Sequence, residues 1–204
     1  MAKFTRDDIT VHKVEKLYQG FFSLNKYHVS HPLFEGGESN VITREVFERG
    51  HAAAVLMYDP KLDELVLIEQ FRMPAFETMQ SPWLIEVVAG ILEPGESAGD
   101  LCYREAQEEA GMAITKLTKI CAFLPSPGAC TESIELFVGE VDATKASGIH
   151  GLDYEAEDIK VLRVSLNEAS TWLETGRINN STAIIAVQWL LLNKHKLLEQ
   201  WGIK

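Results

Sequence analysis

The chain has 204 residues, of which 46% are hydrophobic and 24% are charged, a composition typical of one generous globular domain or one domain with a small appendage. Its formal net charge of −11 at pH 7 argues against nucleic-acid binding, because phosphate backbones select basic surfaces. An anionic small ligand would need local arginines or a divalent cation as an intermediary.

Three features argue against a secreted or membrane protein. Cys102, Cys121 and Cys130 have no CxxC or Cys/His spacing, so we expect free thiols rather than disulfides or a zinc site. Residues 1–10, MAKFTRDDIT, lack the apolar stretch of a secretory signal. The longest mostly apolar run, residues 183–192, is too short to span a bilayer and contains a glutamine. We therefore expect a cytoplasmic protein.

The N-terminal quarter of the chain predicts short strands. The strand-like segments are residues 10–18, 21–30 and 39–50. The link between the last two, residues 31–40, is rich in turn-forming residues. We therefore predict a small antiparallel β subdomain over residues 1–50, which ends near Arg49 or Gly50.

A denser β region follows, and we expect a second domain over residues 51–204. Residues 51–58 and 64–71 flank the turn DPKLDE and predict a hairpin. Residues 83–89, WLIEVVA, predict one further short strand. Later strands are expected at residues 116–124, 133–141 and 158–165.

Two helices are predicted near the C-terminus. Ser165 lies three residues before Glu168, which is a capping-box pattern for a helix that runs to about Gly176. A longer amphipathic helix covers residues 180–198. Strands come first and outnumber the helices, so the expected fold class is α+β, an α/β/α sandwich with a mixed sheet that follows the small β subdomain.

The segment GILEPGESAGDLCYREAQEEAGM, residues 90–112, predicts a loop and then a capped helix that is stopped by Gly111. Its glutamates Glu108 and Glu109 lie three and four residues after Glu105, so all three lie on roughly one helical face. Carboxylates this close repel one another by roughly a few tenths of a kcal/mol per pair. Mg²⁺ reverses the sign of that interaction, because it prefers oxygen ligands. A solvated acidic face is the alternative that composition alone favours.

The same helix has a second face of mostly small side chains. This face consists of Leu101, Cys102, Ala106 and Ala110. Because its members recur about every four residues, we expect it to pack close to a sheet. Arg104 lies four residues before Glu108 and is expected to pair with it.

The spacing of these residues resembles the Nudix box. Gly90 is followed after five residues by Glu96, and after seven more by REAQEEAGM, residues 104–112. Every invariant polar and glycine position of that motif is matched, and only Ala106 departs from its bulky aliphatic position. A match at so many fixed positions is far more specific than a lone GxGxxG.

The resemblance covers nearly the whole chain from about residue 40 onward, and the N-terminal segment more loosely. It points to the bacterial ADP-ribose pyrophosphatase branch of the Nudix superfamily. The matching segments are RGHAAAVL, LVLIEQFR, WLIEVVAG, SPGACTES and VDATKASGIHGLDYEAEDIKV. Pro127, after the box, is a marker associated with this branch, whereas ACT at residues 129–131 departs from its more glycine-rich form.

This resemblance implies that the chain hydrolyses the pyrophosphate of ADP-ribose to AMP and ribose 5-phosphate with Mg²⁺, or with Mn²⁺ in its place. The implied metal ligands are the carbonyl of Ala89 and the side chains of Glu105, Glu108, Glu109 and Glu157. Glu155, in the acidic loop of residues 151–158, is implied as the general base. Two alternatives stay open. Glu155 and Glu157 could have each other's role, or the segment could be an acidic surface loop without function.

The resemblance also implies substrate contacts. These are made by Phe21, Arg44, Arg72 and Glu132. Guanidinium groups suit phosphate and ribose oxygens, and an aromatic ring offers adenine a stacking surface. Phe21 fits a core position of the β subdomain equally well. In the family the N-terminal subdomain is often exchanged across a homodimer, and the short strands of residues 10–47 fit that arrangement.

Two other functions are compatible with the same fold. A hydrolase of another nucleoside diphosphate sugar, such as GDP-mannose, would have the same box and differ in its substrate contacts. A Nudix-fold sensor binds ADP-ribose without cleaving it, but such modules commonly lose the box glutamates and gain a DNA-binding appendage. None of the six histidines is assigned a role.

Overall fold

The computed structural model describes residues 3–152, 154 and 156–203 of the chain. The chain forms two compact units, each assembled from segments that are not contiguous in the sequence. The smaller unit comprises Met1–His51 and Leu124–Ser133, and the larger comprises Ala52–Phe123 and Ile134–Lys204. Within the described part of the chain, no helix is both long and apolar enough to cross a membrane.

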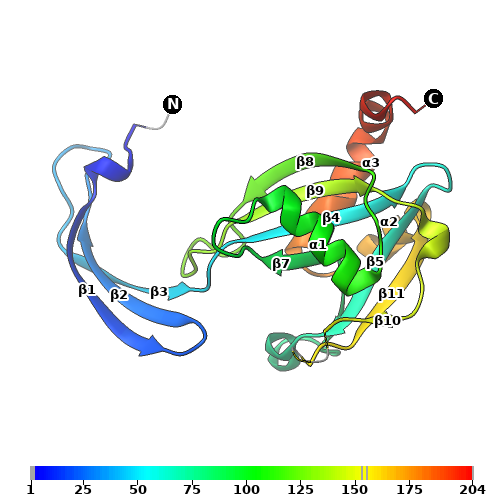
Figure 1. Ribbon diagram of the computed structural model, residues 1–204. Coiled ribbons are helices and arrows are strands. Elements are labelled where there is room, and N and C mark those ends of the chain that lie inside the picture. Colours follow the sequence, from blue (N-terminus) through cyan, green and yellow to red (C-terminus); the bar gives the residue numbers. More distant parts are fainter. Residues whose placement is uncertain (1–2, 153, 155, 204) are drawn as a thin grey trace. The chain divides into compact units, whose positions relative to one another are not determined.

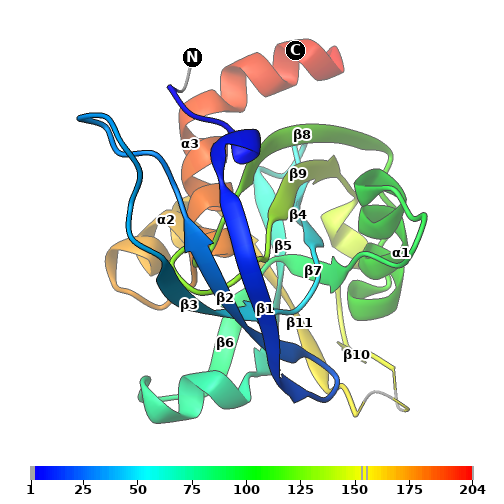
Figure 2. The ribbon, with the colours of Figure 1, turned by 90° about the vertical axis from the view of Figure 1, so that its left-hand side faces the viewer.

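The smaller unit contains the antiparallel sheet that the sequence predicted, and Figure 2 shows its strands. In spatial order the elements are β1 (Thr10–Gln19), β2 (Ser23–Ser30) and β3 (Ile42–Glu48), with the 3-10 helix η1 (Arg6–Asp8) before them. Tyr27 of β2 pairs with Val14 of β1 and with Arg44 of β3. None of the apolar side chains described in this unit is buried, so the sheet has no core of its own.

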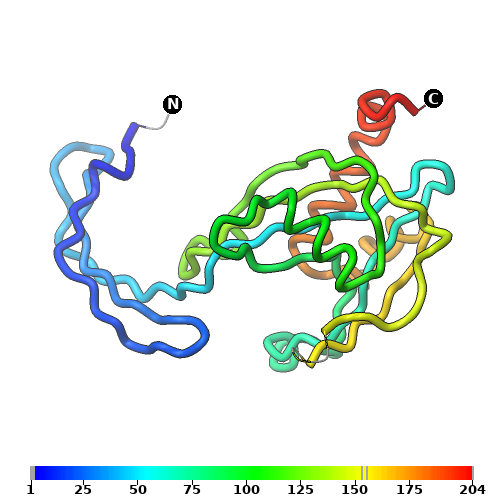
Figure 3. Tube along the Cα trace, in the orientation of Figure 1, coloured from blue at the N-terminus to red at the C-terminus, as the bar shows by residue number. Residues whose placement is uncertain are grey.

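A later segment of the chain completes the smaller unit. The N–H of Phe47 donates to the carbonyl oxygen of Ala129 at 2.7 Å, and the N–H of Thr131 donates to the carbonyl oxygen of Phe47 at 3.1 Å. Figure 3 shows residues 124–133 returning beside the end of β3. The sequence did not predict this pairing, because Thr131 and Phe47 lie 84 positions apart.

An eight-stranded mixed sheet is the centre of the larger unit (Figure 1). Its strands are β4 (Ala52–Asp59), β5 (Glu64–Phe71), β6 (Trp83–Glu86), β7 (Val88–Ile91), β8 (Lys116–Phe123), β9 (Ile134–Glu140), β10 (Ile149–His150) and β11 (Ile159–Ser165). The spatial order is β10-β11-β5-β4-β9-β8, with β6 paired to β5 and β7 paired to β4. β4 and β9 are parallel, and the other pairs are antiparallel.

Helices cover both faces of this sheet. They are α1 (Ala98–Ala110), α2 (Leu166–Glu174) and α3 (Ser181–Trp201), together with the 3-10 helices η2 (Met73–Glu77) and η3 (Ala143–Lys145). Val55 and Met57 of β4 pack in the core under α1, whereas Leu56 and Tyr58 pack in the core under α2 and α3. Because β4 is buried on both faces, its sequence is almost continuously apolar. The predicted α/β/α sandwich with a mixed sheet is thereby confirmed.

The prediction of one strand over residues 83–89 is wrong. The segment forms two strands that separate at Val87, and they pair with different neighbours, β5 and β4. The β4–β5 hairpin is paired only near its turn, from Met57 with Val66 to Asp59 with Glu64. Beyond that point β6 and β7 are inserted between the two strands. Periodicity in one segment does not report such a change of partner.

The predicted helix signals are confirmed at α1 and α2. The Ser97 hydroxyl accepts a hydrogen bond from the N–H of Asp100 at 3.1 Å, and Gly111 closes α1 in the left-handed region at φ 62°. The Ser165 hydroxyl accepts likewise from the N–H of Glu168 at 3.1 Å. The C-terminal helix begins one residue later than predicted, at Ser181, and ends three residues later, at Trp201.

Candidate active site

The apolar face of α1 fixes the position of its acidic face. All four members of the predicted small-residue face, Leu101, Cys102, Ala106 and Ala110, are buried against the sheet. Small side chains let the helix lie close to β4 and β7. The glutamates on the adjoining face are therefore held at the edge of this packed layer and are not free in solvent.

Glu109 is buried at the end of that layer, with only 3% of its surface exposed. Its Oε2 accepts a hydrogen bond from the backbone N–H of Ala89 in β7 at 3.1 Å. Burial, and then the charge of Glu105, raises the pKa of the Glu109 carboxyl to about 8. A carboxylate in this position needs a cation to remain ionised near neutral pH.

Glu105 lies against the backbone of Gly90. A Cβ atom at Gly90 would stand 1.9 Å from Oε1 of Glu105, so no other residue fits beneath this carboxylate without displacing it. Burial raises the pKa of Glu105 to about 7, and the neighbouring Arg104 guanidinium opposes that rise. The glycine of the motif thus lets the Glu105 carboxylate approach the backbone of β7 closely.

Arg104 connects three carboxylates of the segment. Its Nε and Nη2 donate to the two oxygens of Glu96 at 2.9 and 3.1 Å, in a fork-like geometry. Its Nη1 donates to Glu105 at 2.9 Å and to Glu108 at 3.0 Å, the predicted pairing with Glu108. The Arg104 guanidinium also lowers the pKa of Glu96. Glu96 is thus the carboxylate that Arg104 neutralises most directly.

The start of the acidic loop, at Gly151 and Leu152, lies at the C-terminal end of α1. The N–H of Gly151 donates to the carbonyl oxygen of Glu108 at 3.3 Å, and the N–H of Leu152 donates to Oε2 of Glu157 at 3.2 Å. The charge of Glu157 raises the pKa of both Glu105 and Glu109, so the structure brings this loop glutamate to the box carboxylates. Glu155, the predicted base, lies outside the described residues.

The carboxylate oxygens at this site are the kind of ligand that a hard divalent cation prefers. The site offers these oxygens in a partly buried setting, where burial first, and neighbouring carboxylates second, raise the pKa values of Glu105 and Glu109. Within residues 3–152, 154 and 156–203, no three acidic, cysteine or histidine side chains converge tightly enough to hold an ion as they stand. Arg104 instead occupies oxygens of Glu105 and Glu108.

Arg72 is the one predicted substrate contact that belongs to the larger unit. It follows β5, and its Nε donates to Oε2 of Glu86 at 2.8 Å. Its charge lowers the pKa of Glu109 against the stronger effect of burial. The Arg72 guanidinium therefore lies close enough to Glu109 to affect its ionisation.

The other three predicted contacts belong to the smaller unit. Phe21 is 89% exposed at the β1–β2 turn, so the alternative of a core position is wrong. The Arg44 side chain donates to the carbonyl oxygen of Thr43 at 2.8 Å. Glu132 is 7% exposed and pairs with Arg49, whose Nη1 lies 3.3 Å from Oε1. No signal in the sequence pointed to a role for Arg49, because its partner Glu132 is 83 positions away in the chain.

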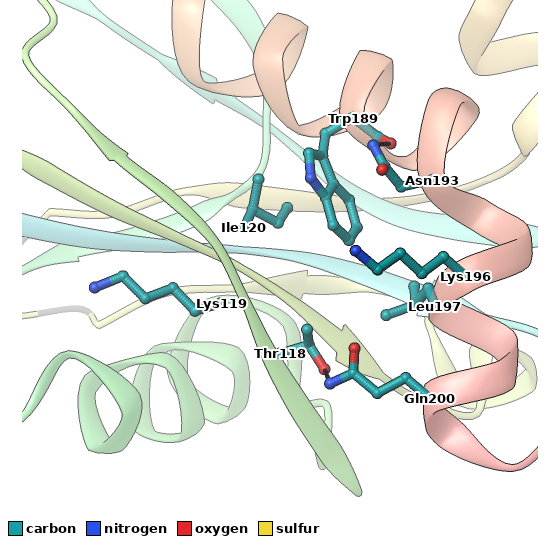
Figure 4. Close-up of a pocket in the computed structure, with 8 residues that line it drawn as sticks. All are labelled: Thr118, Lys119, Ile120, Trp189, Asn193, Lys196, Leu197 and Gln200. Carbon is teal, nitrogen blue, oxygen red and sulfur yellow. Dashed lines mark hydrogen bonds between the residues drawn. The ribbon is translucent and has the colours of Figure 1, made fainter.

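A separate cavity of about 230 Å³ lies between β8 and α3. Figure 4 shows its lining, which consists of Thr118, Lys119, Ile120, Trp189, Asn193, Lys196, Leu197 and Gln200. No predicted site residue belongs to this lining. α3 packs on the opposite sheet face from α1, so the cavity and the carboxylates are on different sides of the larger unit.

Comparison with known proteins identifies relatives over the full length of the chain. Residues 48–198 match the family model described as NUDIX domain. An ADP-ribose pyrophosphatase of Escherichia coli (strain K12) is 50% identical over 199 residues, which cover 98% of this chain and 95% of that protein. An ADP-ribose pyrophosphatase of Haemophilus influenzae is 45% identical over 201 residues, which cover 97% and 93%.

More distant relatives have other names. A GDP-mannose pyrophosphatase of Escherichia coli O1:K1 / APEC is 33% identical over 189 residues, which cover 91% of this chain and 96% of that protein. A crystal structure described as an ADP compounds hydrolase aligns with a TM-score of 0.70 and 19% identity over 96% of both chains. At that identity the likeness supports the fold alone.

Proposed function

The chain belongs to the NUDIX family, and on that premise we propose that it hydrolyses the pyrophosphate of ADP-ribose to AMP and ribose 5-phosphate. Relatives named for this activity are up to 50% identical over nearly the whole chain, whereas the GDP-mannose pyrophosphatases are more distant. The observation that carries the proposal is the buried pair Glu105 and Glu109, held against Gly90 and Ala89. Burial favours the protonated form of both carboxyls, and a bound cation would favour the ionised form.

Mg²⁺, with Mn²⁺ as an alternative, is the proposed cofactor. The residues that would hold it are the carbonyl of Ala89 and the side chains of Glu105, Glu108, Glu109 and Glu157. Divalent cations at such a site neutralise pyrophosphate oxygens and lower the pKa of bound water. Arg104 restrains Glu105 and Glu108 from one side, and the Ala89 N–H restrains Glu109 from the other.

We assign the general base to Glu155, which would remove a proton from the attacking water. The alternative base is Glu157. The hydrogen bond from the N–H of Leu152 holds the Glu157 carboxylate in one orientation, which favours a ligand role for it. Replacement of each residue by glutamine separates the two roles, because loss of the base lowers kcat without weakening the affinity for Mn²⁺.

The proposed substrate contacts are the four that the resemblance implies. Arg44 and Arg72 contact the phosphates and ribose of ADP-ribose, and Glu132 contacts the distal ribose. Phe21 stacks on adenine, since its exposed ring has a free face and an edge contact with Phe22 at 4.7 Å between centroids. Arg49 holds the Glu132 carboxylate in place.

A homodimer with exchanged N-terminal units is the proposed assembly. Residues 1–50 would provide the dimer contacts and the adenine site, and residues 51–204 the hydrolytic centre. The support is the exposed apolar surface of the β1–β3 sheet, which includes Val11, Val14 and Leu17. We propose the cytoplasm as the location, because three cysteines without paired spacing suit a reducing compartment.

The deciding experiment measures release of AMP and ribose 5-phosphate from ADP-ribose with Mg²⁺, beside a parallel reaction with GDP-mannose. The proposal expects turnover of ADP-ribose that EDTA abolishes. Cleavage of GDP-mannose alone would retain the hydrolase and refute the substrate. Tight binding of ADP-ribose without cleavage of either compound would instead identify a sensor.

A further inference from the structure

The junction between α1 and the acidic loop contains a histidine that the sequence left without a role. His150 ends β10, directly before the loop, and its ring lies against Gly111, the residue that caps α1. A Cβ atom at Gly111 would stand 2.6 Å from Cε1 of the ring. Gly111 therefore has two requirements, a left-handed backbone at φ 62° and an open face for the imidazole.

Backbone contacts hold the ring and its strand in place. Nε2 of His150 lies 2.8 Å from the carbonyl oxygen of Ser147 and donates to it in the tautomer with a proton on Nε2. The N–H of Val161 donates to the carbonyl oxygen of Gly148 at 3.1 Å, and His150 pairs with Ile159 in the β10–β11 register. The half-buried imidazole thus lies between the end of the box helix and the start of the loop.

A short path leads from this ring to the loop carboxylate. Gly151, the next residue, donates its N–H to the Glu108 carbonyl oxygen in the last turn of α1. Leu152 donates to the Glu157 carboxylate and accepts from the Glu157 N–H at 3.4 Å. A Cβ atom at Gly151 would stand 2.6 Å from Cβ of Glu157, so the loop is closed tightly at this point.

We propose that His150 is a positioning residue, which docks the acidic loop on the C-terminal end of α1 and so sets the distance between Glu157 and the box carboxylates. The inference rests on the proposed function for its catalytic consequence, but not for the docking itself. The geometry that carries it is the contact of the ring with Gly111 and the hydrogen bonds of the two residues that follow. Without the ring, the contact between this side chain and the helix cap at Gly111 is lost.

The experiment compares His150→Ala with His195→Ala, a control at an exposed histidine of α3. Hydrogen exchange of the metal-free chain is measured at the amides of Gly151 and Leu152. We expect exchange about tenfold faster at both amides in His150→Ala, because local opening exposes them, and no change in the control. His150→Gln, which keeps a donor for the Ser147 carbonyl, should restore part of the protection.

Kinetics of the same variants test the catalytic consequence. His150→Ala should lower kcat about tenfold with KM for ADP-ribose within about twofold, since a displaced catalytic group affects the chemical step. In a Glu157→Gln background the same change should add little. Unchanged amide exchange, or unchanged kcat in an active enzyme, would overturn the proposal.

The two proposals can fail separately. A wild-type chain that cleaves no nucleotide sugar would refute the proposed function, and the exchange data would still decide the docking. If His150→Ala does not fold, as judged by its melting curve, His150→Gln provides both measurements. In that variant, full wild-type protection and full wild-type kcat together would refute a requirement for the ring.

Discussion

The two units of this chain differ in how they bury apolar surface. The larger has a sheet that is covered on both faces, with Leu56 and Met57 of one strand fully buried on opposite sides. The smaller has a three-stranded sheet in which no described apolar side chain is buried. The larger unit can therefore fold on its own core, whereas the smaller needs another surface to cover it.

The units also differ in the chemistry that they carry. The box carboxylates and Arg72 belong to the larger unit, and the remaining proposed substrate contacts belong to the smaller. Substitutions in the larger unit should therefore lower kcat or stability, whereas those in the smaller should raise KM or weaken assembly. Four measurements test this contrast.

The largest expected effect is that of Glu109→Gln on kcat. Glu109 is buried and hydrogen-bonded by Ala89, so the amide keeps the shape but removes the charge. We expect kcat for ADP-ribose to fall about a thousandfold, as for other losses of charge stabilisation in a closed site. Glu174→Gln, at an exposed position in α2, is the matched control. An active Glu109→Gln enzyme would remove this residue from the metal site.

The second measurement compares the same substitution in both units. Leu136→Ala in β9 leaves a cavity in the core and should reduce the free energy of unfolding by roughly 2–5 kcal/mol. Leu17→Ala in β1, where the side chain is 46% exposed within one chain, should cost less than about 1 kcal/mol at protein concentrations too low for the proposed dimer. Urea unfolding monitors both variants. A loss at Leu17 as large as that at Leu136 would mean that a partner covers the small sheet.

The third measurement concerns the adenine site. Phe21→Ala should raise KM for ADP-ribose about tenfold with little change in kcat, because stacking of a base on an aromatic ring is worth about 1–3 kcal/mol. Phe34→Ala, at another exposed phenylalanine of the same unit, serves as the control. Equal effects of the two substitutions on steady-state kinetics would argue against a specific contact at Phe21.

The fourth measurement concerns a pH dependence confined to the larger unit. The pKa values of Glu105 and Glu109 are raised to about 7 and about 8 in the folded chain, from 4.5. Between pH 4.5 and the folded-state pKa values, the two carboxyls hold protons in the folded state that they have released in the unfolded state. The free energy of unfolding should therefore fall as pH rises through this range, by at most about 1.4 kcal/mol per pH unit for each proton.

Urea unfolding in EDTA at a series of pH values tests this trend. Addition of Mg²⁺ should weaken the dependence, because a bound cation favours the ionised carboxylates. Glu109→Gln should remove its part of the dependence without metal. Stability that rises with pH over the same window would show that both carboxyls are ionised in the folded, metal-free chain.

Local patterns predicted the elements of this fold well. Two features of α1 can be predicted from its own segment. The residue types at Ser97 and Gly111 indicate the caps, and the helical period indicates the small-residue face. The turn between β4 and β5 could also be predicted, because its turn-forming residues lie in one short segment. The break at Val87 could not, because it depends on which strand each half of the segment pairs with.

The sequence by itself determined which residues share the acidic face of α1, since spacing along a helix sets the relation of Glu105, Glu108 and Glu109. Only the tertiary structure decided their electrostatics. Glu109 has its raised pKa because β7 and its own helix bury it, and that burial depends on contacts between segments remote in the chain. The contact of His150 with Gly111 has the same origin. Spacing is a property of one segment, whereas burial is a property of the packed molecule.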